Sequence, residues 1–280
     1  MGNETKKVIS IWDKVAPSFG KVGPSYWNSF GERLVELSSI KRGSSVLDIG
    51  MGRGASLFPA IKKAGEKGYV IGIDNSSMMV SETHKDILTQ KITNADVKMM
   101  CAEFLEFENN SFDNIICGFG MGYLLLSDNK LNGILRVLKN GGQAGFSIWG
   151  IQKDQIWLNE IVNKYLDLPP QKNNSTGMPK LDCVEGVIKI LQDSGFENVE
   201  AHEEAADVIY RNKEEWWQEM WANAVRGIFE SIEELGKDKF DTFKREVFDG
   251  LEQFNKDSGF CFKMPVIYAY GEKLVKRTCF

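Results

Sequence analysis

Short apolar runs alternate with helical segments along the first half of the chain, and this rhythm restricts the possible folds more than any other feature. The runs occupy residues 45–50, 69–74, 97–101, 113–117 and 143–149. The helical segments between them are 55–63, 76–90 and 129–138. Strands that alternate with helices form βαβ units, whose parallel strands are buried on both faces. The rhythm therefore predicts an α/β fold, with ligands at the carboxyl ends of the strands.

The second half of the chain departs from this rhythm. Residues 208–210 and 264–271 have the composition of terminal strands. Between them a long helical stretch opens at Asn212, and Glu215 three residues later is typical of a capping box. A second helix follows, so a helical pair at 212–255 interrupts the two strands. We expect this pair to pack as an insertion over the ligand end of the sheet.

Composition indicates an ordinary globular protein and excludes several classes. The chain has 280 residues, 42% of them hydrophobic, and a net charge of −5, which argues against a broad electrostatic nucleic-acid surface. It has no apolar run long enough to span a membrane, and its N-terminus does not resemble a signal peptide. The odd number of cysteines without a C-x-x-C pair predicts reduced thiols in the cytoplasm. The two histidines, His84 and His202, are far apart, so we expect no metal site.

The glycine-rich loop that follows the first apolar run is the strongest motif. Glycines after a strand allow the backbone to approach a ligand. Gly50, Gly52 and Ala55 also have the spacing of the loose dinucleotide-binding fingerprint. That fingerprint includes an acidic residue about 20 positions further on, and Asp74 lies 22 residues beyond Gly52. Asp48 argues against a dinucleotide, because its carboxylate would face a pyrophosphate. It suits S-adenosylmethionine, which carries an ammonium and a sulfonium but no phosphate, while Asp74 can accept both ribose hydroxyls.

Five segments in order resemble the motifs of the class I S-adenosylmethionine-dependent methyltransferases. They are residues 46–54, 70–79, 101–104, 111–116 and 135–142. Within this class, the run from Gly118 to Met121 resembles the ubiquinone/menaquinone-biosynthesis C-methyltransferases, although Gly122-Tyr123 replaces their Arg-Asn. The resemblance implies a Rossmann-like fold with a mostly parallel seven-stranded sheet, an antiparallel last strand and, in this chain, a helical cap insertion.

The same resemblance implies a donor-binding set. Its members are Asp48, Gly50, Gly52, Asp74, Asn75, Met79, Cys101, Ala102, Glu103 and Gly118. Asp48 and the glycines would hold the methionine part, and Asp74 would hold the ribose. Asn75 and Met79 would flank the adenine, although Met79 serves equally well as a packing residue. Cys101 stands where the family usually has Asp, so one adenine contact is either lost or mediated by water.

Four further residues are candidates outside these motifs. His202 is a candidate general base, and its alternative is an ordinary surface or strand histidine. Tyr123 follows the fourth strand, where an acceptor would approach, and is a candidate catalytic contact. Phe19 and Tyr26 would fold over the cofactor, although a simple N-terminal packing helix explains them as well.

These observations favour a methyltransferase that acts on O, N or C of a small, largely apolar metabolite, including aromatic ones. The alternatives are an NAD(P)-dependent oxidoreductase and a non-catalytic S-adenosylmethionine-binding protein. The sequence lacks the Asn/Asp-Pro-Pro-Tyr/Phe motif of amino-nitrogen methylation, so we expect a small-molecule partner and no nucleic acid. We divide the chain into an N-terminal helical lid at 1–43, a methyltransferase domain at 44–211 and 258–280, and a cap at 212–257.

Overall fold

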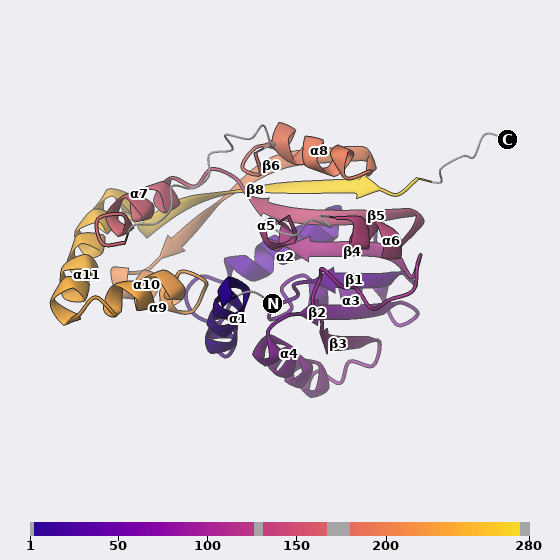
Figure 1. Cartoon of the computed structure of the whole chain (residues 1–280), viewed down its shortest axis with the longest axis horizontal. Helices are drawn as coiled ribbons and strands as arrows, with labels where there is room; N and C mark the ends of the chain where they lie inside the picture. The colour runs from indigo at the N-terminus through magenta and orange to yellow at the C-terminus, as the bar shows by residue number, and fades with distance from the viewer. Residues whose placement is uncertain (1–2, 126–130, 167–179, 275–280) are drawn as a thin grey trace. The chain divides into compact units, whose positions relative to one another are not determined.

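The computed structural model describes residues 3–125, 131–166 and 180–274 (Figure 1). The chain forms two compact units. The first comprises Met1–Tyr26, Ile151–Met178 and Ala205–Pro265, and the second comprises Trp27–Gly150, Pro179–Glu204 and Val266–Phe280. This grouping joins the N-terminal segment to the helices that were expected to form a cap. The three-part division into lid, domain and cap stays a prediction.

The described strands form one mixed sheet. They are β1 (Ser45–Ile49), β2 (Tyr69–Asp74), β3 (Ala95–Met99), β4 (Phe112–Gly118), β5 (Leu138–Trp149), β6 (Glu197–Tyr210), β7 (Asn255–Lys256) and β8 (Gly259–Glu272). Their order is β3-β2-β1-β4-β5-β8-β6, with the short β7 paired to β8 (Figure 1). Neighbouring strands from β3 to β5 are parallel, and β8 runs antiparallel to β5. The predicted α/β fold, with its antiparallel last strand, is confirmed; β7 is additional to the seven strands predicted.

The helices of the second unit lie between or beside these strands. They are α2 (Tyr26–Leu37, whose first residue belongs to the first unit), α3 (Leu57–Ala64), α4 (Ser77–Thr89), α5 (Met121–Leu124), α6 (Asn132–Val137) and α8 (Val184–Asp193). Side chains buried against the sheet form its core, among them Leu47, Ile115, Phe146 and Phe196. The strand runs are almost entirely apolar because parallel strands are covered on both faces.

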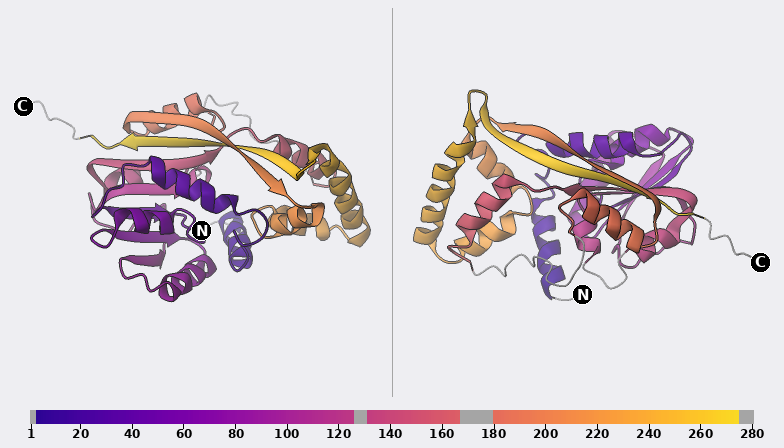
Figure 2. Two further views of the ribbon diagram at one scale, coloured as in Figure 1. Left: turned by 180° about the vertical axis from the view of Figure 1, so that it is seen from behind. Right: turned by 90° about the horizontal axis from the view of Figure 1, so that it is seen from above.

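The first unit is built mainly from helices (Figure 2), and aromatic side chains pack between them. Its helices are α1 (Asn3–Val15), α7 (Lys153–Val162), α9 (Lys213–Trp221), α10 (Arg226–Glu233), α11 (Lys237–Leu251) and the 3-10 turn η1 (Glu252–Phe254). Trp217 stacks on Phe229 with ring centroids 4.5 Å apart, and Phe229 meets Phe243 edge-on at 5.3 Å. Within the described residues, no helix combines the length and apolarity needed to cross a membrane.

The long helix expected from Asn212 is divided into α9 and α10. It begins as predicted, since the Asn212 side chain accepts a hydrogen bond from the Glu215 amide at 2.9 Å. The Glu215 carboxylate, however, accepts from the amide of Arg211 rather than from that of Asn212. The break follows from Asn223, whose side chain accepts from the Val225 amide at 2.9 Å. Such local side-chain bonds compete with continuation of a helix.

Lys63 closes the C-terminal end of α2, and its loss is expected to destabilise the protein. Its Nζ donates to the carbonyls of Val35, Glu36 and Ser38 at 2.7, 3.0 and 2.8 Å. Lys63→Met keeps the aliphatic stem but removes the charge and the donors. We expect urea unfolding to show a free energy lower by about 1–3 kcal/mol. The exposed neighbour Lys62 provides the control, and an equal loss in Lys62→Met would contradict the capping role.

Candidate functional site

Asp48 is a buried carboxylate at the carboxyl end of β1. Its Oδ2 accepts a hydrogen bond from Ser56 Oγ at 2.8 Å, whereas its Oδ1 has no hydrogen-bond partner among the described residues. Burial raises the pKa of Asp48 to about 7 against the lowering effect of the Ser56 bond, and the nearby Asp74 raises it further. A buried carboxylate oxygen without a partner fits a cationic or hydrogen-bond-donating group of a ligand.

The glycine loop beyond Asp48 has a backbone that side chains would disfavour. Gly50 and Gly52 have φ angles of +67° and +51°, in the left-handed region. A Cβ placed on Gly50 would meet no atom within 4 Å, so the space beside this residue is open. The loop can therefore present its backbone directly to a ligand, as the sequence predicted.

Asp74, at the end of β2, faces the same loop. Its Oδ2 accepts from the Gly52 amide at 3.0 Å, and its Oδ1 accepts from the Ser76 amide at 2.8 Å. Asp48 pairs in register with Gly72 on the adjacent strand, which places the two acids at one edge of the sheet. A carboxylate has about four acceptor positions, so Asp74 can hold the loop and ribose hydroxyls together. The structure thus brings together the two acids that the sequence singled out.

The expected adenine segment lies beside the end of β2. Asn75 Nδ2 and Cys101 Sγ are 3.9 Å apart, so the second motif and the adenine motif meet. Met79 is buried in α4, as its alternative role in packing also requires. Ala102 is half-buried, and Glu103 is exposed. The adenine roles of these residues stay predictions.

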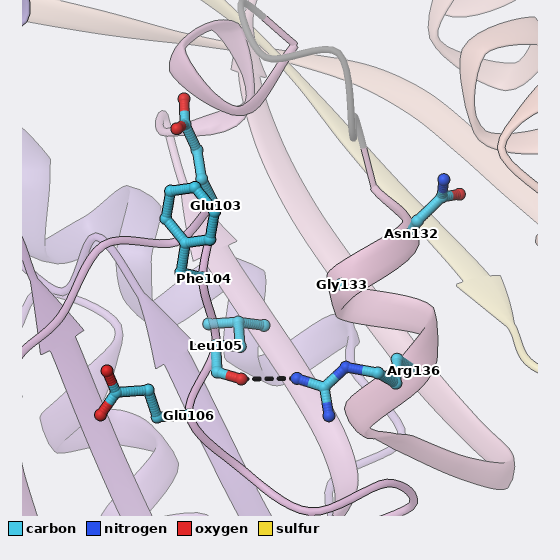
Figure 3. Close-up of a pocket in the computed structure, with 7 residues that line it drawn as sticks. All are labelled: Glu103, Phe104, Leu105, Glu106, Asn132, Gly133 and Arg136. Atoms are coloured by element: carbon cyan, nitrogen blue, oxygen red, sulfur yellow. Dashed lines mark hydrogen bonds between the residues drawn. The ribbon is translucent and has the colours of Figure 1, made fainter. Parts of the chain in front are cut away.

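Glu103 also borders a shallow pocket (Figure 3). The other residues that line it are Phe104, Leu105, Glu106, Asn132, Gly133 and Arg136. The Arg136 guanidinium donates to the carbonyl of Leu105, and the Phe104 ring is 67% exposed. An exposed ring of this size at the end of the adenine motif is an apolar surface on which a flat group could lie.

Gly118 ends β4 between two serine hydroxyls. A Cβ on Gly118 would lie 3.7 Å from Ser147 Oγ and 3.8 Å from Ser56 Oγ. Ser147 is completely buried, and its Oγ has no partner among the described residues. Because Ser56 also donates to Asp48, a row of polar groups runs from β1 to β5. Sequence reasoning missed both serines, since an isolated serine leaves no pattern.

An aromatic cluster lies beside this polar row, formed by Trp27, Phe30, Phe119 and Trp149. Phe119 stacks on Trp149 with ring centroids 4.1 Å apart, and Trp27 and Phe30 meet both rings edge-on at 5.5–6.0 Å. Phe119 has a φ of +56°, and its amide donates to the Ser147 carbonyl at 2.9 Å. Positive φ in a bulky residue is strained, and such strain is concentrated at functional sites.

The two candidate catalytic residues occupy different surroundings. Tyr123 lies in α5, just beyond β4 and Phe119, and its side chain is about half exposed at 48%. His202 lies on β6, and β4, β5 and β8 separate this strand from β1. At about 4.8 Å per strand, β6 is about 19 Å from Asp48. The structure therefore does not bring His202 to the Asp48 region; its Nε2 lies 3.2 Å from Glu204.

Phe19 and Tyr26 belong to the first unit. Phe19 meets Trp12 edge-on at 5.5 Å, and the Tyr26 hydroxyl donates to the buried Glu219 at 2.5 Å. These contacts agree with a packed N-terminal segment, and the role of both residues above the cofactor stays a prediction. In the part of the chain that the structure describes, no three side chains of metal-ligating type gather.

The chain belongs to the ubiE/COQ5 methyltransferase family, whose model matches residues 4–160. It is 33% identical to aklanonic acid methyltransferase DauC of Streptomyces sp. over 51% of this chain and 64% of that protein. It is 34% identical to the ubiquinone/menaquinone biosynthesis C-methyltransferase UbiE of Hydrogenovibrio crunogenus over 50% of this chain and 57% of that protein. The chain thus spans less than two thirds of these two relatives.

A solved structure has the same fold. YcgJ of Bacillus subtilis superposes with a TM-score of 0.58 and 16% identity, covering 88% of this chain and 99% of that protein. The structural similarity covers both halves of the sequence, and at 16% identity it indicates a shared fold only. The family expected from the five motifs is confirmed.

Proposed function

We propose that this protein transfers a methyl group from S-adenosylmethionine to O, N or C of a small, largely apolar metabolite. The observation that carries the proposal is the buried Asp48, with its partnerless Oδ1, beside an open glycine loop and one strand away from Asp74. The donor, when bound, supplies a methyl group already activated by the sulfonium. The chain then has to bind the two molecules, orient them and exclude water.

The residues at the strand ends fit this donor. Asp48 would accept from the ammonium of the methionine part, which supplies the missing partner of Oδ1. Asp74 would accept from the ribose hydroxyls while it holds the Gly52 amide. A pyrophosphate at the same place would put like charges beside the buried Asp48, which disfavours the oxidoreductase alternative.

The aromatic cluster supports an apolar acceptor. Phe119 and Trp149 are partly exposed at the ends of β4 and β5, where parallel sheets bind their ligands, and the partly exposed Trp27 of α2 packs against both. Aromatic faces stabilise flat or apolar molecules. The names of DauC and UbiE indicate small-molecule substrates for those proteins. We place the reaction in the cytoplasm, with no nucleic-acid partner.

Mass spectrometry of a metabolite extract incubated with the protein and methyl-deuterated donor tests the proposal. We expect one or a few metabolites to gain a labelled methyl group. Donor binding without any labelled product would favour the non-catalytic alternative, and binding of NADH in place of the donor would favour the oxidoreductase. The Asp48→Asn variant serves as the control for label incorporated without the protein's activity.

Asp74→Ala is expected to weaken donor binding by about 1–3 kcal/mol, the scale of lost hydrogen bonds to a charged group. The substitution removes the ribose acceptor and also releases the Gly52 amide. Calorimetric titration with S-adenosylhomocysteine measures the effect. Asp193→Ala, which removes an exposed carboxylate in α8, is the matched control. Equal affinities in the two variants would contradict the ribose assignment.

A further inference from the structure

Gly52 is held at both of its peptide groups by residues outside the glycine loop. Its amide donates to Asp74 at 3.0 Å, and its carbonyl accepts from Thr83 Oγ1 at 2.8 Å. Thr83 is completely buried in α4. Threonine hydroxyls inside helices usually bond to the carbonyl one turn back. The Thr83 hydroxyl instead forms its hydrogen bond outside α4, with a residue 31 positions earlier in the chain.

The residue after Gly52 is tied to the same helix. The Arg53 side chain is only 6% exposed, and its guanidinium pairs with Asp86 and, at 3.8 Å, with Glu82. Residues 82, 83 and 86 lie within about one turn of α4. Two successive loop residues are therefore fixed to one short section of this helix.

These contacts close a ring that includes the expected ribose acid. Asp74 accepts from the amide of Ser76, the N-cap residue of α4, at 2.8 Å. The ring runs from Asp74 through Ser76 along α4 to Thr83, across to Gly52, and back to Asp74. Displacement of Gly52 at its carbonyl therefore also moves its amide, which donates the hydrogen bond that orients the Asp74 carboxylate.

We propose that Thr83 is a positioning residue for donor binding: its hydroxyl fixes the carbonyl of Gly52, and the amide of the same residue in turn orients Asp74. Without the hydroxyl, the Gly52 carbonyl loses its bond to α4, and the backbone of Gly52, which no side chain restricts, is free to change its angles. Asp74 then faces the ribose in several orientations instead of one. This inference rests on the proposed function, because the ligand that it concerns is the methyl donor.

Thr83→Val, which has nearly the same shape but no hydroxyl, tests the proposal. The probe is S-adenosylhomocysteine, and its dissociation constant is measured by calorimetry. We expect Thr83→Val to bind about tenfold more weakly, the equivalent of one lost hydrogen bond. Thr83→Ser retains the hydroxyl and is expected to bind within about threefold of the wild type. Thr89→Val, at the exposed end of the same helix, is the matched control.

The thermal midpoint of each variant separates positioning from a general loss of stability. Rescue of the affinity by Ser, but not by Val, at similar midpoints supports the role of the hydroxyl. If Thr83→Val does not fold, Thr83→Ala is compared with Thr83→Ser in its place. Wild-type affinity in a folded variant without the hydroxyl would overturn the inference and leave the proposed function intact. Failure of the wild type to bind the probe would instead overturn the proposed function.

Discussion

Asp48→Asn is expected to weaken donor binding strongly. The same substitution is expected to stabilise the donor-free protein above pH 7. The side chain is completely buried, and its pKa is raised from 3.8 to about 7. As the pH rises from 4 to 7, the unfolded chain releases the Asp48 proton while the folded chain retains it. The contribution of Asp48 to stability therefore falls over this interval, by up to about 4 kcal/mol for three pKa units, and stays constant at higher pH.

Urea unfolding at several pH values measures this effect. Asparagine has no proton to release, so the variant should gain stability relative to the wild type between pH 4 and 7, as the cost of ionising the buried Asp48 develops in the wild type. Asp193→Asn, at an exposed site, should follow the wild type. Parallel curves for wild type and Asp48→Asn would show that the carboxyl group titrates normally.

Whereas Asp48→Asn should raise the stability of the donor-free protein, it should lower the affinity for the donor. Replacing the carboxylate removes a charge-assisted bond to the ammonium, which should weaken S-adenosylhomocysteine binding about 100-fold. In the wild type, a bound ammonium favours the ionised carboxylate, so binding near pH 6 should release a proton. Calorimetry in buffers of different ionisation enthalpy detects that proton. Its absence, together with undiminished affinity of the variant, would exclude Asp48 from the donor site.

Glu219→Ala is expected to lower the stability of the protein by about 3–5 kcal/mol, because it removes a shared acceptor and leaves a cavity. Glu219, in α9, is 2% exposed. It accepts from the hydroxyls of Tyr26 and Tyr210, and Asn223 lies 3.5 Å away. Burial, followed by the adjacent carboxylate, raises the pKa of both tyrosines, so they remain donors over the whole working range of pH.

Two further variants define this network. Glu219→Gln keeps the shape and one acceptor oxygen, so it should cost less than the alanine variant in chemical denaturation. Glu214→Ala removes an exposed carboxylate from the same helix, where its partner is Lys244 at 3.3 Å. This control should change the unfolding free energy by less than about 1 kcal/mol. If Glu214→Ala lowered the unfolding free energy as much as Glu219→Ala, the hydrogen bonds of Glu219 with the tyrosine hydroxyls would not be the cause of the loss.

The donor half of the site could be predicted because its signals are local. Asp48 and Asp74 lie at the ends of strands that the apolar runs reveal, Gly50 follows the first of these strands, and the parallel register brings the strand ends together. The parallel direction of β1 to β5 follows from the same βαβ rhythm, whereas the order of the strands was not predicted. Asn212 and Glu215, only three residues apart, likewise predicted the start of α9.

The remaining features depend on contacts between distant parts of the chain. Ser147 lies beside Gly118 only because β5 pairs with β4. The aromatic cluster combines Trp27 of α2 with rings from two strand ends. Thr83 resembles any other helical threonine in the sequence, and its bond to Gly52 exists only after α4 packs on the loop. Such roles require the folded geometry.

The stacked Phe119 and Trp149 give the protein a built-in optical probe. Closely packed aromatic rings in a fixed asymmetric arrangement produce near-ultraviolet circular dichroism, and this signal depends on their mutual angle. These rings lie 4.1 Å apart at an interplanar angle of 26°, with Trp27 edge-on to both. A molecule that binds against these partly exposed rings is expected to change their surroundings and with them the signal. Compound collections can therefore be screened for acceptors by optical titration alone, with neither a label nor a coupled assay, before any product has been identified.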